Sequence, residues 1–188
     1  KTVSEYTEYT NPGQNYSIRY PSVFLPYLQN QIIDSHDYTS FKIDYNNYFS
    51  ITAENIQNPA TAIKEKTGLL KQSINNRISV KEEGNVVLSG KEFYRLDYET
   101  YRGPDTYHVQ SYYIINGSKL YTIELSSRFK KPSEEITNAF LDIVKSIRFT
   151  EPSKPQKPIN INFKEYRNDY EGYSFSYPEN WSLSNVSK

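Results

Sequence analysis

The feature that most constrains this chain is a gapless repeat of one segment at an offset of 157 residues. Residues 9–24 align with residues 166–181, and both copies read as a tyrosine-rich strand that ends in Tyr-Pro. A period of this length is domain-sized, since solenoid repeats span roughly 20–50 residues. The same domain is therefore predicted to begin twice. The identical pairs are Tyr9/Tyr166, Asn11/Asn168, Tyr16/Tyr173, Ser17/Ser174, Tyr20/Tyr177 and Pro21/Pro178.

A proline-rich spacer separates the two copies. Pro152, Pro155 and Pro158 stand at every third position among polar residues, a pattern typical of an extended linker. The predicted organisation is one domain over residues 1–149, a linker over residues 150–163 and the start of a second copy over residues 164–188. Because so short a fragment cannot bury a core, we expect strand 173–177 to lack a partner in its own chain. It would be disordered, or join a neighbouring molecule by strand exchange or β-augmentation.

Alternating apolar residues predict an antiparallel sheet within residues 1–149. Turn residues then divide the pattern into hairpins: Asn46-Asn47, Gly84-Asn85, residues 102–105 and Asn116-Gly117, where both positions would need positive φ. The predicted strands cover residues 16–20, 41–45, 48–54, 78–83, 86–88, 93–101, 106–115 and 120–125.

Two helices are predicted from their caps and their periodicity. Asn58 followed by Pro59 marks the start of the first helix. The second begins near Ser133 and places apolar residues on one face at Ile136, Phe140, Ile143 and Ile147. The order of elements predicts an α+β fold in which an antiparallel β-sheet is sandwiched by helices, an α/β/α arrangement.

Composition and charge exclude several classes of protein. The absence of Cys rules out disulfides and thiolate metal sites, and the absence of Met indicates a processed or trimmed product. Lys plus Arg and Asp plus Glu both number 22, so the chain lacks the positive field that a nucleic-acid binder needs. No apolar stretch approaches the roughly 18 residues of a transmembrane helix.

Tyrosine and arginine residues of the central hairpin form the candidate binding site. Tyr98, Tyr101, Arg102, Tyr107 and Tyr112 have the composition of an interface hot spot. Such rings could instead stack on a sugar. The third alternative is that tyrosine replaces leucine in a core with polar edges, which we expect for at least half of these rings.

The remaining polar groups give weak signals for chemistry. Asp34, His36 and Asp37 form a polar segment that a solvated loop explains, and the alternative is that they hold a cation. His108 is expected to be a surface or strand-edge residue. The sequence has no nucleophile elbow and no glycine-rich phosphate loop, so we expect neither catalysis nor a cofactor.

The two copies of the repeat carry a family resemblance. Residues 172–181 resemble the opening of PsbP-like domains: a glycine or asparagine, an aromatic-rich strand, Tyr-Pro, and then a tryptophan. The first copy, residues 15–24, is similar but has Phe24 where Trp181 stands in the second. Residues 146–149, which follow the last predicted helix, resemble the aromatic end of the family.

The resemblance implies an α/β/α sandwich and a binding role. Members include extrinsic photosystem proteins, a Ran-binding nuclear-import factor and bacterial envelope lipoproteins. Most bind proteins, and the family offers no catalytic residues to transfer. We therefore expect a non-catalytic binding or scaffold module of an exported, envelope-associated bacterial protein with tandem domains, which a lipid could anchor. The alternative is a ligand- or glycan-binding domain with an aromatic pocket and, in one version, a bound cation.

Overall fold

The structure, a computed structural model, describes residues 5–33, 36–72, 78–150, 163–168 and 172–178. These residues belong to two compact units, Lys1–Pro152 and Ser153–Lys188.

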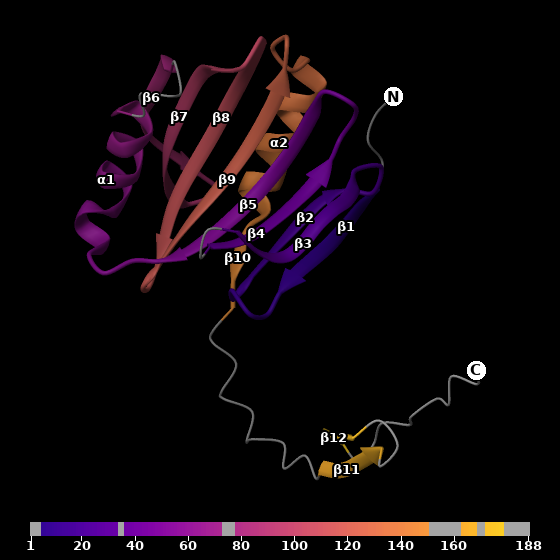
Figure 1. Ribbon diagram of the computed structural model, residues 1–188. Coiled ribbons are helices and arrows are strands. Elements are labelled where there is room, and N and C mark those ends of the chain that lie inside the picture. The colour runs from indigo at the N-terminus through magenta and orange to yellow at the C-terminus, as the bar shows by residue number, and fades with distance from the viewer. Residues whose placement is uncertain (1–4, 34–35, 73–77, 151–162, 169–171, 179–188) are drawn as a thin grey trace. The chain divides into compact units, whose positions relative to one another are not determined.

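A seven-stranded antiparallel sheet forms the centre of the first unit (Figure 1). Its strands lie in the order β3-β4-β5-β9-β8-β7-β6, so three consecutive hairpins join β6 to β9. The strands are β3 (Leu25–Ile33), β4 (His36–Lys42), β5 (Asn47–Asn55), β6 (Ile78–Leu88), β7 (Lys91–Arg102), β8 (Asp105–Asn116) and β9 (Lys119–Arg128). Helix α1 (Pro59–Gln72) follows β5, and α2 (Glu134–Ser146) follows β9.

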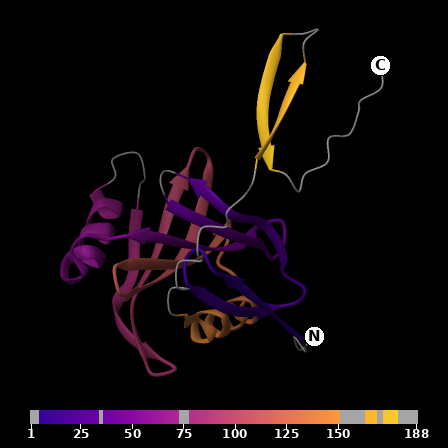
Figure 2. The same ribbon diagram turned by 90° about the horizontal axis from the view of Figure 1, so that it is seen from below.

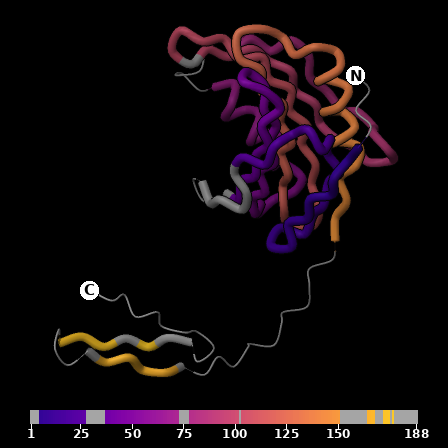
Figure 3. The backbone as a smooth tube through the Cα atoms, turned by 90° about the vertical axis from the view of Figure 1, so that its right-hand side faces the viewer, coloured from indigo at the N-terminus to yellow at the C-terminus, as the bar shows by residue number. Residues whose placement is uncertain are grey.

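One face of this sheet is covered by α2 and by a second, three-stranded sheet. The small sheet has the order β1-β2-β10, from β1 (Tyr6–Asn11), β2 (Tyr16–Pro21) and β10 (Arg148–Phe149). Helix α2 packs directly on β2, and the view from below places them together (Figure 2). The tube view shows α2 along one side of the large sheet (Figure 3).

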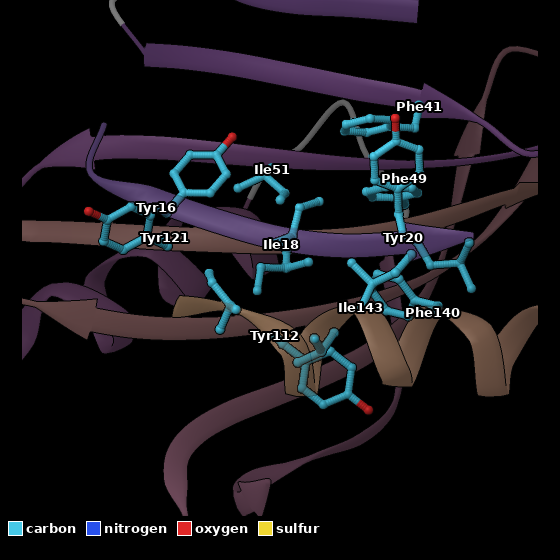
Figure 4. Packing of buried hydrophobic residues seen from close by; sticks show 14 of the residues in the cluster. Tyr16, Ile18, Tyr20, Phe41, Phe49, Ile51, Tyr112, Tyr121, Phe140 and Ile143 are labelled. Atoms are coloured by element: carbon cyan, nitrogen blue, oxygen red, sulfur yellow. The ribbon is translucent and has the colours of Figure 1, made fainter. Parts of the chain in front are cut away.

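Aromatic rings fill the core between these layers. Tyr16, Ile18 and Tyr20 of β2 are buried, because alternate residues of this strand point into the molecule. The rings of Phe41 and Phe49 stack with centroids 4.5 Å apart, and Tyr20 lies beside them (Figure 4). Phenylalanine and tyrosine thus supply much of the area that aliphatic side chains supply elsewhere.

Helix α1 packs against the opposite face. Its Ile63 and Leu70 contact a smaller cluster that contains Leu96, Val109 and Leu120. The predicted α+β fold with an antiparallel sheet and two helices is confirmed. The finer prediction of a sheet sandwiched by helices is not confirmed, since β-sheet dominates the unit and the three-stranded sheet forms part of the layer that contains α2.

Both predicted helix caps are present. The Asn58 side-chain oxygen accepts a hydrogen bond from the Ala60 amide at 3.1 Å. At α2 the Ser133 hydroxyl accepts from the Ile136 amide at 3.3 Å. These bonds satisfy amides that have no partner inside the helix, which is why asparagine and serine mark helix starts in a sequence.

The hairpin predicted at Gly84-Asn85 is wrong, because β6 runs through both residues. Its partner β7 is long enough to pair on either side of Gly84, so the turn falls at Ser89-Gly90, with φ values of 48° and 75°. In the β8–β9 turn only Gly117 has positive φ, at 61°. The prediction that both Asn116 and Gly117 adopt it is therefore wrong, although the hairpin itself is present.

Within the first unit, the sequence patterns did not predict β1 or β3, and they misplaced β4. Strand β1 has no apolar alternation, and β3 carries Pro26 at the edge of the sheet, where a missing amide does not break a ladder. The strand predicted over residues 41–45 is β4, which lies mostly upstream, at His36–Lys42. In the loop that follows it, the Asp44 carboxylate accepts from the Asn46 and Asn47 amides.

The second unit repeats the first hairpin of the chain. Strand β11 (Phe163–Asn168) pairs with β12 (Tyr173–Pro178), so the expectation that residues 173–177 have no partner in their own chain is wrong. In the β11–β12 hairpin Phe163 pairs with Pro178. In the β1–β2 hairpin Tyr6 pairs with Pro21, so the two hairpins have the same strand register at an offset of 157 residues. The turns correspond as well: Asn15 has φ 59° and its equivalent Gly172 has φ 71°.

Candidate functional site

The predicted binding residues lie on both faces of the large sheet. Tyr98 and Tyr107 belong to the face that α1 contacts, and Tyr98 is buried there. Tyr112 lies on the other face, buried against Phe140 of α2. Side-chain alternation along β7 puts Tyr101 on that second face, where it is 44% exposed. The five residues thus do not form one continuous surface: Arg102 ends β7, and its side chain lies outside the described residues.

Exposed aromatic rings gather at one end of the sheet, uppermost in Figure 1, where β7 and β9 end and β5 and β8 begin. We call this group the aromatic end and define it as Tyr45, Tyr101, Arg128 and Phe129 together with Tyr107, which is half-buried, pairs with Arg128 between β8 and β9, and lies on the other face of the sheet from Tyr101. Tyr45 is 81% exposed and Phe129 is 54% exposed. The Arg128 amide donates to the Asn46 carbonyl at 2.9 Å, and the Phe129 amide donates to the Thr106 carbonyl at 2.7 Å. These bonds tie the connections together at one end of the sheet.

Arg128 is held in place at the centre of the aromatic end. Its Nε donates to the Asp105 carboxylate at 2.9 Å, and a second guanidinium nitrogen donates to the same oxygen at 2.5 Å. These hydrogen bonds to Asp105 raise the pKa of Arg128 above its ordinary value. The guanidinium carbon lies 4.4 Å from the centre of the Phe129 ring, within the range of a cation–π contact. The ring is thereby pre-oriented although it is exposed.

Phe129 has a backbone conformation that phenylalanine rarely adopts. Its φ is 70°, in the left-handed region where a side chain meets the backbone. Such a conformation costs on the order of 1–2 kcal/mol and persists only where the surroundings enforce it. Strain of this kind is concentrated at functional sites, so an exposed, strained and ion-pair-supported ring marks this end as a candidate binding surface.

The sequence predicts Tyr101 and Tyr107 as binding residues but not Tyr45, Arg128 or Phe129. No local pattern distinguishes these residues, because Tyr45 and Phe129 lie in short connections and Arg128 is simply the last residue of β9. Only the pairing of β5 with β9 and of β8 with β9 brings their connections together.

The candidate cation site is only partly within the described residues. Asp34 and the side chain of His36 lie outside them. Asp37 accepts a hydrogen bond from the Asn11 side-chain amide at 3.0 Å, and burial raises the pKa of its carboxyl. Within the described part of the chain, no three His, Asp or Glu side chains are grouped closely enough to hold a metal ion.

A small pocket of about 160 Å³ includes His108. The His108 Nδ1 lies 3.1 Å from the Glu99 carboxylate, and Lys81 lies 2.9 Å from the same side chain. Thr137 also lines this pocket, and its hydroxyl donates to the Ser133 carbonyl at 3.0 Å.

A larger groove of about 1440 Å³ runs between α1 and the ends of β6, β7 and β8. Ile63, Tyr94 and Ile115 contribute apolar surface to it. Lysine and glutamate both stand along it, including Lys91 and Glu92, so the groove has no clear preference for one sign of charge. None of the described residues predicted as binding or metal sites lines it.

Comparison with known proteins gives matches in structure alone. No family model matches the chain, and no curated protein matches its sequence. No helix among the described residues is both long enough and apolar enough to cross a membrane.

The chain has a PsbP-like fold. It is similar to cyanobacterial PsbP (CyanoP) from Synechocystis sp. PCC 6803, with a TM-score of 0.56 and 17% identity over 78% of this chain and 93% of that one. It is also similar to the Ran-binding protein Mog1p of Saccharomyces cerevisiae, with a TM-score of 0.55 and 8% identity over 78% and 96% of the two chains. A protein from Bacteroides thetaiotaomicron matches with a TM-score of 0.52 and 11% identity, over 83% of this chain and 52% of its own. At these identities the likeness concerns the fold.

Proposed function

We propose that this chain is a non-catalytic protein-binding module of an exported, envelope-associated bacterial protein, and that residues 163–178 begin a second copy of the same domain. The repeated hairpin carries the proposal. A match of strand register and of positive φ at Asn15 and Gly172 is not expected of two unrelated tyrosine-rich hairpins. A tandem array joined by a proline-rich linker is an architecture suited to display and binding.

The identities within the repeat fall on residues that dock the first hairpin. The Tyr9 hydroxyl lies 3.3 Å from that of Thr39, and Asn11 donates to Asp37. Tyr16 packs edge-on against Tyr121, with ring centroids 5.9 Å apart. The equivalents Tyr166, Asn168 and Tyr173 have the same residue types. Tyr16 is fully buried, whereas Tyr173 is 49% exposed, so the second hairpin has the side chains for docking on a domain of this kind.

Two further observations support a binding role. The structural neighbour Mog1p is named as a Ran-binding protein, and its fold is similar to this one. The aromatic end combines exposed rings with a fixed arginine, the residue types that dominate protein interfaces. The proposed location in the cell envelope rests on the family resemblance together with the absence of cysteine.

The coding sequence downstream of residue 188 tests the tandem arrangement. We expect about 120 further codons that specify strands and a closing amphipathic helix, the content that follows residue 31, the equivalent of residue 188, in the first copy. A stop codon directly after Lys188 would refute the second copy.

An assay panel tests the absence of catalysis. Esterase, peptidase, glycosidase and phosphatase substrates should give no turnover above that of heat-denatured protein. Turnover that a single substitution such as His108→Ala abolishes would overturn this part of the proposal.

A further inference from the structure

We infer, on the basis of the proposed second copy, that the β11–β12 hairpin docks on another molecule of this chain in place of that molecule's β1–β2 hairpin. The docking place is the slot that Tyr121 of β9, Ser146 of α2 and Arg148 of β10 line around β2. The partner is thus a second copy of the same protein, and the two copies exchange an equivalent element, as in domain swapping.

The slot holds the first hairpin partly through backbone atoms. The Ser146 hydroxyl of α2 accepts a hydrogen bond from the Arg19 amide at 2.8 Å. The Tyr121 hydroxyl of β9 donates to the Gln14 carbonyl at 2.7 Å. Backbone amides and carbonyls are present whatever the side chains are, so a second hairpin of the same register offers the slot the same groups.

The second hairpin has the register and the turn that this docking requires. Its strands pair as β1 and β2 do, at an offset of 157 residues. In the first hairpin the Asn15 carbonyl accepts from the Thr150 amide at 3.0 Å, and Asn15 has φ 59°. Gly172 stands at the equivalent position with φ 71°. The turn that presents this carbonyl therefore has the same backbone conformation in both hairpins.

Two tyrosine rings make the slot specific for this repeat. The rings of Tyr9 and Tyr16 lie with their centroids 6.2 Å apart, and Tyr16 packs edge-on against Tyr121 (Figure 4). The rings of Tyr166 and Tyr173 form the same pair, with centroids 6.1 Å apart. Tyr16 is fully buried, whereas Tyr173 is 49% exposed. The second hairpin thus presents an assembled ring pair that still has surface to bury on docking.

One core position favours the molecule's own hairpin. Ile18 is 1% exposed, in the cluster that also contains Ile51 and Ile143 (Figure 4). The equivalent residue of the second copy is Phe175, which is larger, and a larger side chain in a filled core forces its neighbours to shift. The covalent connection to β3 gives the own hairpin a further advantage over one from another molecule. We therefore expect exchange to become prominent when the own hairpin is weakened.

Addition to a sheet edge is the other way in which a second hairpin could bind. Strand β1 is an edge of the three-stranded sheet, so a strand could pair with it. Addition there would leave the first hairpin in its slot, and β2 would still separate the added strand from β10. Only exchange brings residue 174 next to Arg148, because Arg148 pairs with Ser17, the equivalent of Ser174.

The experiment cross-links two different variants of the full 188-residue chain. The chain has no cysteine, so each variant carries a single engineered thiol. The acceptor carries Arg148→Cys together with Tyr16→Ala, which weakens the docking of its own hairpin. The donor carries Ser174→Cys. The acceptor thiol is activated as a mixed disulfide with thionitrobenzoate, so the donor thiolate attacks the acceptor sulfur, thionitrobenzoate leaves, and the new disulfide joins donor to acceptor.

A donor with Ser176→Cys is the matched control. Both serines are exposed on the same face of β12, but residue 176 is equivalent to Arg19, two residues away from the partner of Arg148. We expect Ser174→Cys to give at least about ten times more cross-linked dimer on a gel, because a disulfide tolerates little separation of its two Cβ atoms. Adding Tyr173→Ala to the donor should lower the yield at least about tenfold, because the buried ring is lost.

Two further variants test the preference and guard against an unfolded acceptor. Phe175→Ile in the donor removes the size difference at the position of Ile18 and should raise the yield severalfold. Circular dichroism checks the acceptor, and if Tyr16→Ala unfolds it, Ile18→Val replaces that substitution as a smaller loss in the same strand.

Equal yields from Ser174→Cys and Ser176→Cys, a yield that Tyr173→Ala does not lower, or no dimer with a folded acceptor overturns hairpin exchange. An unchanged yield with Phe175→Ile overturns the role of the size difference. A stop codon directly after Lys188 would refute the second copy without altering any cross-link, so the two failures are separate observations.

Discussion

Replacing Phe129 by glycine and, in parallel, by alanine separates backbone strain from the contacts of the ring. Both variants lose the ring and its stack on Arg128, so this loss cancels when the two are compared. Only alanine keeps a Cβ in the left-handed conformation at φ 70°. The difference in their free energies of unfolding therefore measures the strain at this position.

The difference in free energy of unfolding between the two variants is the result of two opposing contributions. A Cβ in the left-handed region destabilises the folded state by about 1–2 kcal/mol. Glycine adds freedom to the unfolded chain, which lowers stability by about 0.4–1 kcal/mol. We therefore expect Phe129→Gly to be more stable than Phe129→Ala by about 0.5–1 kcal/mol. The lost cation–π contact, worth about 0.5–1 kcal/mol at an exposed site, should leave Phe129→Gly close to the native protein.

Urea unfolding monitored by far-ultraviolet circular dichroism is the suitable assay. Trp181, the one tryptophan, belongs to the second unit and would not report on the first. With an m-value of about 1–3 kcal/mol per M, the two midpoints should differ by a few tenths of a molar. Equal midpoints, or a higher midpoint for alanine, would refute the assignment of strain to Phe129.

Three further substitutions test the core, the hairpin and a helix cap. Tyr121→Phe removes a 2.7 Å hydrogen bond to the Gln14 carbonyl and should cost about 1 kcal/mol in urea unfolding at pH 7. Burial raises the pKa of Tyr121 from 10.0 to about 12, so between pH 10 and 12 this hydroxyl loses its proton in the unfolded chain before it does so in the folded one. The native protein should therefore lose stability over this pH range, and Tyr121→Phe should lose less. Equal losses in the two proteins would contradict this prediction. Asp37→Asn keeps an acceptor for Asn11 without a buried charge. Because the pKa of Asp37 in the folded protein is raised above its ordinary value of 3.8, the native protein should lose stability as pH rises from 3.8 through the folded pKa. Asp37→Asn should therefore be more stable than the native protein at pH 7 but not at pH 3. An unchanged thermal midpoint of Asp37→Asn at pH 7 would contradict this prediction. Ser133→Ala should cost about 1 kcal/mol by loss of the α2 cap, whereas Ser133→Asp should retain stability.

Local chemistry made parts of this fold predictable from sequence. Asn58 and Ser133 mark helix starts because a side-chain oxygen satisfies a nearby amide, an interaction that needs no distant partner. The alternation of Tyr16, Ile18 and Tyr20 identifies β2, and it too can be seen locally, because the two-residue period of a strand shows within a few residues. The repeat at residues 166–181 could likewise be found by comparing the chain with itself.

Two of the residues that hairpin composition predicts for binding, Tyr101 and Tyr107, lie at the aromatic end. Tyr98 and Tyr112 were chosen on the same grounds, yet they are buried on opposite faces of the sheet. Composition along a hairpin does not distinguish its two faces, because that depends on which layer packs against each one.

By itself, the sequence determined the helix caps, the strands with one buried face, the duplicated strand and the exclusion of disulfide and thiolate chemistry. Tertiary structure alone decided that β6 continues through Gly84, that β1 and β3 are strands, and that Tyr45, Arg128 and Phe129 meet at one end of the sheet. The physical reason is the range of the interactions. A cap or an alternating face is satisfied within a few residues, whereas strand register and the meeting of loops depend on partners tens of residues away along the chain.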